Sequence, residues 1–225
     1  MSEVHRIFLL SPASVAGTRA ALVMGASSEL EMARRLRRHG VPLGELFSFI
    51  SGLYFRGKLA YASAFSDAPQ GVHGAFVITA SGGLVPPETT VTLDRLRQIT
   101  AGNLDSANAR FRAPLERDAQ LVADRVGASC QIILLGSIAT PKYVDPLLDI
   151  FGEQLMFPAE FVGRGDMSRG GLMLRCVASG EQLTYLSVLG AARHGRKPPK
   201  LKPLPRKRLR PLPATRRTGP SCKPG

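Results

Sequence analysis

The sequence lacks tryptophan, has three cysteines among its 225 residues and contains no apolar run of the roughly 18 residues that a membrane span needs. The cysteines, Cys130, Cys176 and Cys222, are scattered, with no Cys-x-x-Cys pair and no histidine in metal-ligand spacing. They indicate reduced thiols, with Cys130 and Cys176 buried. The first residues also lack the basic start and apolar core of a signal peptide. We therefore expect a cytoplasmic protein with no metal, no cofactor and no membrane span.

Acidic residues are absent from the segment 193–225, which holds twelve lysines and arginines and eight prolines. Residues 1–192 carry 18 basic and 17 acidic side chains, a net charge of +1, so the segment 193–225 supplies +12 of the total of +13. A segment of this composition repels itself and cannot build a hydrophobic core. We predict one folded domain, 1–192, and a disordered tail rich in proline, lysine and arginine, 193–225.

The tail favours an anionic partner. Its densest cationic block suits phosphates of nucleic acid or an anionic surface, and consists of Arg206, Lys207, Arg208 and Arg210. The Pro-Leu-Pro repeats beside this block allow a different interpretation, in which the tail docks a protein partner as a polyproline II helix. Nucleic acid is the partner we expect.

Three short apolar runs end in small polar loops, and each indicates a buried strand. The predicted strands are 6–10, 74–79 and 131–135, with a further short strand at 155–157. Helices are predicted at 28–39, 92–99, 114–126 and 141–151, in two pieces between 43 and 65 joined near Gly57, and after a cap at Ser168. Strands that alternate with helices predict an α/β fold with a mostly parallel central sheet flanked by helices and a disordered basic C-terminal tail.

In open parallel sheets, ligands bind outside the carboxyl ends of the strands. The small residues that follow the three strands are therefore candidates for binding a phosphate or carboxylate, and Lys142 lies one residue inside the helix after the third strand. The other candidates are Ser11, Ser81, Gly136, Ser137 and Thr140. The alternative is that these residues only turn the chain and cap helices.

The loop 163–171 combines arginines, an acid, a serine and four glycines in nine residues. Arg164, Ser168 and Arg169 are candidates for holding a phosphate or a base, because the glycines let the backbone approach a ligand closely. Asp166 is the candidate catalytic residue, as an acid, a base or a stabiliser of a cation. A structural role for Asp166, paired with either arginine, is equally consistent with the sequence.

Tyr54, Arg56 and Lys58 join an aromatic ring with two bases, a combination that suits stacking on a base and pairing with its phosphate. The alternative places the aromatic side chains in the core and the charges at its rim. The four histidines are isolated from the carboxylates and cysteines that a catalytic triad or a metal site requires.

Four stretches are similar in type and order to YaaA-like peroxide-stress proteins and to small α/β domains related to uracil-DNA-glycosylase-like folds. They are residues 9–13, 54–57 and 81–86, and Leu135 and Gly136 with Tyr143. The resemblance covers about two thirds of the folded part and implies a compact domain that handles DNA, RNA or a nucleobase. The chain departs from the family pattern at Ser14, where the family has lysine, and at 82–84.

Three functions follow from these patterns. The first is a nucleic-acid-associated protein whose strand-end loops bind a nucleotide, a base or a phosphate while the tail adds phosphate affinity. The second is a small-molecule enzyme, an N-glycosidase or a transferase, acting on a nucleoside or a sugar phosphate. The third is a protein-interaction module that uses the proline-rich tail. The sequence leaves open whether the protein is an enzyme.

Overall fold

The computed structural model describes residues 4–102, 104, 105, 107–139, 141–192 and 194–201. The strands are β1 (Arg6–Leu10), β2 (Val41–Pro42), β3 (Ala75–Ile78), β4 (Leu84–Val85), β5 (Thr90–Val91), β6 (Gln131–Leu135), β7 (Leu155–Pro158) and β8 (Tyr185–Ser187). The helices are α1 (Thr18–Met24), α2 (Glu31–Arg38), α3 (Leu43–Ser51), α4 (Leu53–Phe65), α5 (Leu93–Thr100), α6 (Ala109–Val126), α7 (Pro141–Phe151) and α8 (Asp166–Ser179), with 3-10 turns at Gly152–Gln154 and Ala159–Phe161.

The predicted α/β fold is confirmed. Six strands form one sheet in the order β4-β3-β1-β6-β7-β8, in which β3, β1, β6 and β7 are parallel and the edge strands β4 and β8 run antiparallel to their neighbours. The chain leaves β1 toward β3 on one side and leaves β6 toward β7 on the other. The carboxyl ends of β1 and β6 therefore form a topological switch point, where ligands bind in sheets of this kind.

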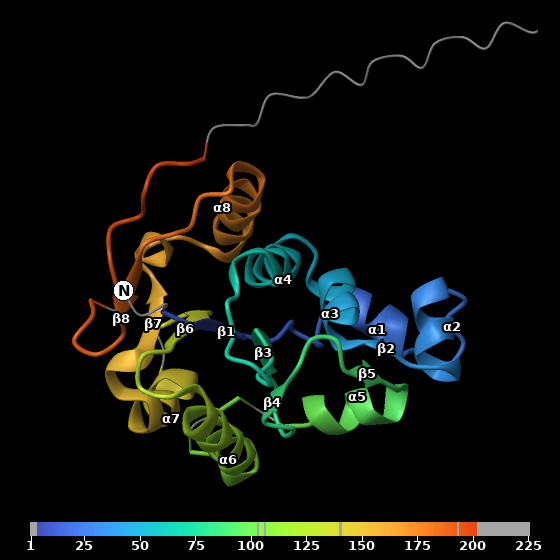
Figure 1. Ribbon diagram of the computed structural model, residues 1–225. Helices are drawn as coiled ribbons and strands as arrows, with labels where there is room; N and C mark the ends of the chain where they lie inside the picture. The colour runs from blue at the N-terminus through green and yellow to red at the C-terminus, as the bar shows by residue number, and fades with distance from the viewer. Residues whose placement is uncertain (1–3, 103, 106, 140, 193, 202–225) are drawn as a thin grey trace, which may run out of the picture.

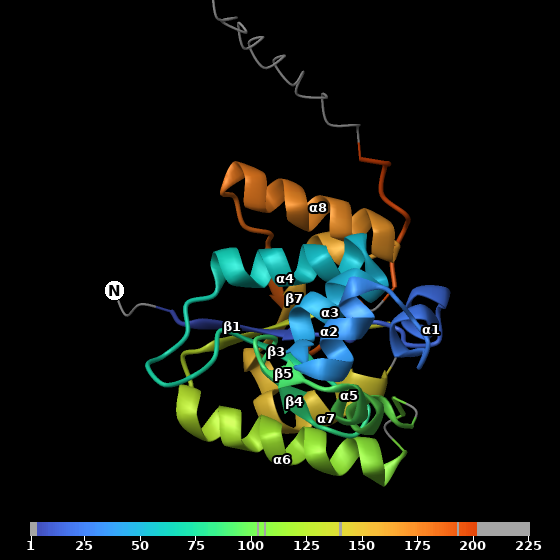
Figure 2. The same cartoon turned by 90° about the vertical axis from the view of Figure 1, so that its right-hand side faces the viewer.

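Helices cover both faces of the sheet because successive side chains of each buried strand point to opposite faces. Phe8 and Leu10 pack in the cluster that includes α3, α4 and α8, whereas Ile7 and Leu9 pack in the cluster that includes α6 and α7. Figures 1 and 2 show α4 and α8 together on one side of the sheet and α6 and α7 on the other. The near-continuous burial of β1 follows from this double coverage.

The two helices predicted between 43 and 65 meet at Gly52, and the prediction of a junction near Gly57 is wrong. Gly52 has a φ of +61°, a left-handed conformation that glycine adopts without a steric penalty. Gly57 lies inside α4 and contacts Gly170 of α8, where an added Cβ would meet the Gly170 carbonyl oxygen at 2.7 Å. Gly57 therefore serves the packing of two helices rather than a break in one.

Several helix boundaries differ from the predicted ones. Helix α6 begins at Ala109, five residues before Pro114, with the Asn108 side chain accepting from the Arg110 N–H. Helix α8 begins at Asp166 with Gly165 at the N-cap position, so Ser168 lies in the first turn and does not cap the helix. The predicted cap at Thr92 is confirmed, since its side chain accepts from the Arg95 N–H.

The first part of the predicted tail lies against the folded domain. Residues 194–201 have no regular secondary structure, yet a Cβ added at Gly163 would meet the Arg196 carbonyl oxygen, and one added at Gly195 would meet Val162. Residues 202–225, which include Arg206, Lys207, Arg208 and Arg210, lie outside the described residues, as does Cys222.

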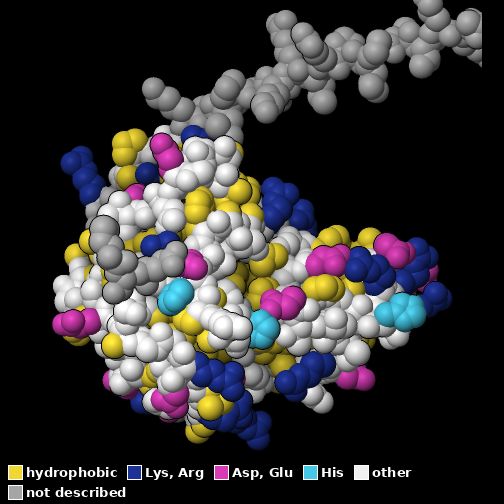
Figure 3. Space-filling view, viewed as in Figure 1, with side chains coloured by type: hydrophobic (Ala, Val, Ile, Leu, Met, Phe, Trp, Pro, Cys, Tyr) yellow, Lys and Arg dark blue, Asp and Glu magenta, His cyan; other side chains and the backbone are white. Residues whose placement is uncertain are grey.

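The described surface carries charges of both signs. On the face in Figure 3, lysines and arginines are interspersed with acidic side chains, and on α2 Arg34 pairs with Glu31 at 2.9 Å. Cys130 and Cys176 are free and buried, as predicted. No helix in the described part of the chain is both long and apolar enough to cross a membrane.

Substituting Gly170 by Ala tests the contact between α4 and α8. The new methyl group would lie 2.7 Å from the Leu53 carbonyl oxygen, so we expect a loss of about 1–3 kcal/mol in the free energy of unfolding, measured by urea denaturation. Gly171→Ala is the matched control, because its methyl group meets only the end of Leu201 at 3.6 Å and gains up to about 1 kcal/mol of helix propensity. Equal stability of the two variants would contradict the close contact.

Candidate functional site

A cleft of about 540 Å³ lies at the carboxyl ends of β1, β3 and β6. The loop after β1 forms one wall, Thr79 and Ala80 after β3 contribute to another, and Ser137 and Lys142 face it from the segment after β6. The remaining lining residues are Phe47, Ser51, Tyr54, Thr100, Gly102, Leu104, Tyr143 and Asp166. Among the candidate residues named from the sequence, Ser11, Ser137 and Lys142 therefore line one cleft, together with Asp166 and Tyr54.

Other predicted site residues lie elsewhere. Ser81 does not line the cleft, and its hydroxyl donates a hydrogen bond to the Gln98 carbonyl oxygen of α5. Arg56 is exposed on α4 and does not line the cleft. Gly136, Arg164 and Arg169 line a separate hollow of about 190 Å³. Thr140 lies outside the described residues.

The loop before α8 is held mainly by its own contacts. Arg169 donates two hydrogen bonds to the Phe161 carbonyl oxygen, at 3.2 and 3.0 Å, and lies 3.5 Å from the Asp166 carboxylate. Arg164 donates to the Ser168 hydroxyl at 3.2 Å. These three predicted ligand-binding side chains, Arg164, Ser168 and Arg169, thus shape the loop that presents Asp166. The contact between Arg169 and Asp166 is the structural pairing that the sequence also allowed for this loop.

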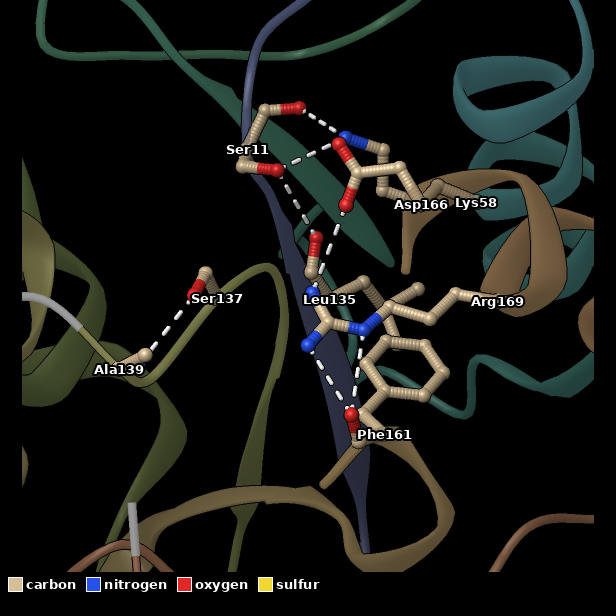
Figure 4. A network of polar contacts seen from close by, with 8 residues as sticks. All are labelled: Ser11, Lys58, Leu135, Ser137, Ala139, Phe161, Asp166 and Arg169. Carbon is tan, nitrogen blue, oxygen red and sulfur yellow. Dashed lines mark hydrogen bonds and ion pairs between the residues drawn. The ribbon is translucent and has the colours of Figure 1, made fainter. Parts of the chain in front are cut away.

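Lys58 lies beneath the cleft, with 1 % of its surface exposed. Its Nζ donates to the carbonyl oxygen of Ser11 and lies 2.8 Å from the Ser11 hydroxyl, which in turn donates to the Leu135 carbonyl oxygen at 3.3 Å. The ammonium also lies over the rings of Tyr54 and Phe55, at 4.4 and 5.0 Å from their centres. Figure 4 shows Lys58 pointing at Ser11 with Asp166 beside both.

This position differs from the one predicted for Lys58. A side chain buried under Ser11 does not present its charge to a nucleic-acid backbone on the surface. Tyr54 and Lys58 lie one helical turn apart and share a face, whereas Arg56 is exposed. The structure therefore does not bring Tyr54, Arg56 and Lys58 together as one surface.

Burial sets the electrostatics of the site. Desolvation lowers the pKa of Lys58 to about 7, with Arg169 acting in the same direction and Asp166 opposing it. Burial likewise raises the pKa of Tyr54 to about 12 and raises that of Tyr143. The Asp166 side chain is 67 % exposed, so it keeps its hydration at the mouth of the cleft. Near neutral pH the site therefore holds a buried amine that can gain or lose a proton, beside the exposed side chain of Asp166.

The sequence carried a signal for Lys58 that the prediction did not use. The apolar face of α4 passes through Phe55, Tyr61 and Ala62, all of which are buried. Position 58 lies on that face at helical spacing, so a lysine there interrupts an apolar stripe. A charged residue at such a position is a candidate for a buried functional group.

Stability should depend on pH through Lys58. Between its folded pKa of about 7 and its ordinary value of 10.5, the unfolded chain holds a proton that the folded chain lacks, so the free energy of unfolding rises with pH. The slope contributed is at most about 1.4 kcal/mol per pH unit and fades below pH 7. Urea denaturation between pH 6.5 and 8.5 should show a steeper rise in the wild type than in Lys58→Met.

The range ends at pH 8.5 because burial raises the pKa of Cys130 to about 11. Its thiol ionises in the unfolded chain first, which lowers stability as the pH rises further and would mask the effect of Lys58. Parallel pH profiles for the wild type and Lys58→Met would show that Lys58 keeps its proton throughout and would contradict the lowered pKa.

Comparisons with known proteins give no information on the function. No family model, no curated protein and no solved structure matches the chain. Among the described residues, no group of three or more histidine, cysteine, aspartate or glutamate side chains is placed to hold a metal ion. The resemblance to YaaA-like and uracil-DNA-glycosylase-like domains stays a prediction.

Proposed function

We propose that the protein binds a nucleotide, or a nucleotide unit of a nucleic acid, in the cleft at the ends of β1, β3 and β6. The observation that carries this proposal is the composition of the lining, which combines an ammonium, several hydroxyls and aromatic rings at a topological switch point. The cleft volume of about 540 Å³ falls within the range of small-molecule sites.

The phosphate end of the ligand would lie toward Lys142 and Ser137. The Lys142 ammonium is 4.8 Å from the centre of the Tyr143 ring, and both residues line the cleft at the start of α7. The first turn of a helix favours negative charge, and an ammonium there adds a charged donor. An anionic group is therefore the part of the ligand that this end suits.

The base would lie toward the aromatic side chains. Tyr54 lines the cleft and is partly exposed, so its ring can stack on a base of any type, and the buried rings of Phe47 and Tyr143 add apolar lining. The exposed Asp166 carboxylate at the same site can accept hydrogen bonds from a base edge or a ribose hydroxyl. Anionic and aromatic ends together favour a nucleotide over an inorganic anion.

The basic tail extends the proposal from a nucleotide to a nucleic acid. Residues 1–192 carry a net charge of +1, so long-range attraction to phosphate comes from the segment 193–225. In this proposal the tail supplies affinity without sequence preference, and the cleft holds one nucleotide.

Calorimetric titration with a nucleoside and its mono-, di- and triphosphate tests the cleft. We expect the phosphorylated ligands to bind and Lys142→Gln to weaken them by about tenfold or more, because one charged hydrogen bond contributes about 1.5–3 kcal/mol. Arg95→Gln is the matched control, since it removes one positive charge from an exposed position outside both the cleft and the tail. Equal affinities for the two variants, or for nucleoside and nucleotide, would refute the assignment.

Fluorescence anisotropy with single-stranded DNA over a salt series tests the tail. Changing Arg206, Lys207, Arg208 and Arg210 to Gln in the full chain should reduce the dependence of log affinity on log salt by about 0.7 per lost phosphate contact. Replacing Lys142 should weaken binding at every salt concentration and leave most of the slope intact. A slope that the fourfold variant does not change would show that this block of the tail does not hold phosphates.

A further inference from the structure

We propose that Ser11 and Lys58 form a nucleophile and general-base pair that hydrolyses small carboxylic esters in the cleft. The observation is the 2.8 Å contact between the Lys58 Nζ and the Ser11 hydroxyl at the floor of the cleft. Activated serine nucleophiles share one arrangement: the serine lies within hydrogen-bond distance of a base, and a third group orients that base. Lysine can replace histidine as the base.

Neighbouring groups fix both members of the pair. The Ser11 hydroxyl is held by the Leu135 carbonyl oxygen at 3.3 Å, and the residue lines the cleft with 7 % of its surface exposed. Lys58 is oriented by its hydrogen bond to the Ser11 carbonyl oxygen and by the rings beneath it. A neutral amine keeps two hydrogens and one lone pair. It can therefore donate to this carbonyl and accept from the Ser11 hydroxyl when that hydroxyl rotates its single hydrogen from the Leu135 carbonyl oxygen to Lys58 Nζ.

Lys58 can act as a base because its surroundings disfavour the ammonium. Burial lowers the pKa of Lys58 to about 7, the charged groups that act on it are Asp166 and Arg169 of α8, and Tyr54 lies on its own helix. A general base works best with a pKa near the working pH. Ser137 also lines the cleft, but its hydroxyl accepts from the Ala139 N–H at 3.3 Å and, among the described residues, forms no hydrogen bond with a lysine or histidine.

The reaction balances without a cofactor. Ser11 Oγ bonds to the carbonyl carbon of the ester as its proton moves to Lys58 Nζ, and the carbon–oxygen bond to the alcohol breaks as Lys58 returns that proton to the leaving oxygen. Water then attacks the acyl-serine, gives a proton to Lys58 and releases the carboxylic acid, and Ser11 recovers its proton. One ester and one water become one acid and one alcohol.

The cleft favours esters that carry a negative charge. Lys142 lines the same space as Ser11, and its ammonium offsets charge on a substrate carboxylate or phosphate. This inference goes beyond nucleotide binding and does not depend on it, because it concerns the reactivity of one hydroxyl group. Loss of nucleotide binding in the titration above would leave it standing.

The test is covalent labelling of the full chain with diisopropyl fluorophosphate, followed by peptide mapping in a mass spectrometer. The Ser11 Oγ should displace fluoride and form a bond to phosphorus, and the labelling rate should rise about tenfold per pH unit up to about pH 7 and then level off. Lys58→Met should slow labelling by about 100-fold or more. Ser11→Ala should abolish both the label and the release of nitrophenol from p-nitrophenyl acetate.

Ser187→Ala is the matched control, since it removes a serine hydroxyl that lies outside the cleft and should change neither rate. The pH profile of the wild type keeps the test decisive if Lys58→Met does not fold. A label on Ser137 or on Lys58 in place of Ser11, a rate that does not vary between pH 5.5 and 8.5, or full labelling of folded Lys58→Met would each overturn the proposal.

Discussion

The close contact between α4 and α8 at Gly57 and Gly170 determines the geometry of the candidate site. Each glycine faces the backbone of the other helix at a distance that no side chain permits, since added Cβ atoms would lie 2.7 Å from opposing carbonyl oxygens. Lys58 is the next residue after Gly57, and Arg169 is the residue before Gly170. The same contact that packs the helices therefore sets Lys58 of α4 beside the first turn of α8, where Asp166 lies.

This contact also explains why Lys58 is buried while Asp166 is exposed to solvent. The sheet lies on one side of α4 and α8 packs on it, so the lysine side chain runs inward toward the end of β1 and meets Ser11. Asp166 is at the beginning of α8, at the edge of the contact, and stays 67 % exposed. Arg169 links the two environments, with its guanidinium bound to the Phe161 carbonyl oxygen and to Asp166. The two side chains lie in different environments because the packing of α4 against α8 excludes solvent from Lys58 and leaves Asp166 exposed.

The sequence predicts the sheet better than it predicts the site. Apolar runs bounded by polar loops locate β1 and β6 at their observed ends, because buried strands of a parallel sheet are continuous in hydrophobicity. The strand order then places Ser11 and Ser137 in one cleft. Sequence patterns do not reveal what a polar side chain bonds to, so Ser81 and Arg169 were expected at a ligand and instead hold α5 and the loop before α8. The burial of Lys58 depends on a contact between helices more than 100 residues apart, which local patterns do not carry.

A buried lysine needs a reason beyond packing. A methionine or leucine at position 58 would fill the same space against Tyr54 and Phe55 without the cost of desolvating an amine. The hydrogen bonds to Ser11 offset part of that cost, yet the Ser11 hydroxyl also has a partner in the Leu135 carbonyl oxygen. Residues that break the local rules of folding concentrate at functional sites, and so do ionisable groups whose pKa is shifted by burial. Because Lys58 breaks such a rule directly under the switch point of the sheet, its contact with Ser11 is best explained by chemistry in the cleft.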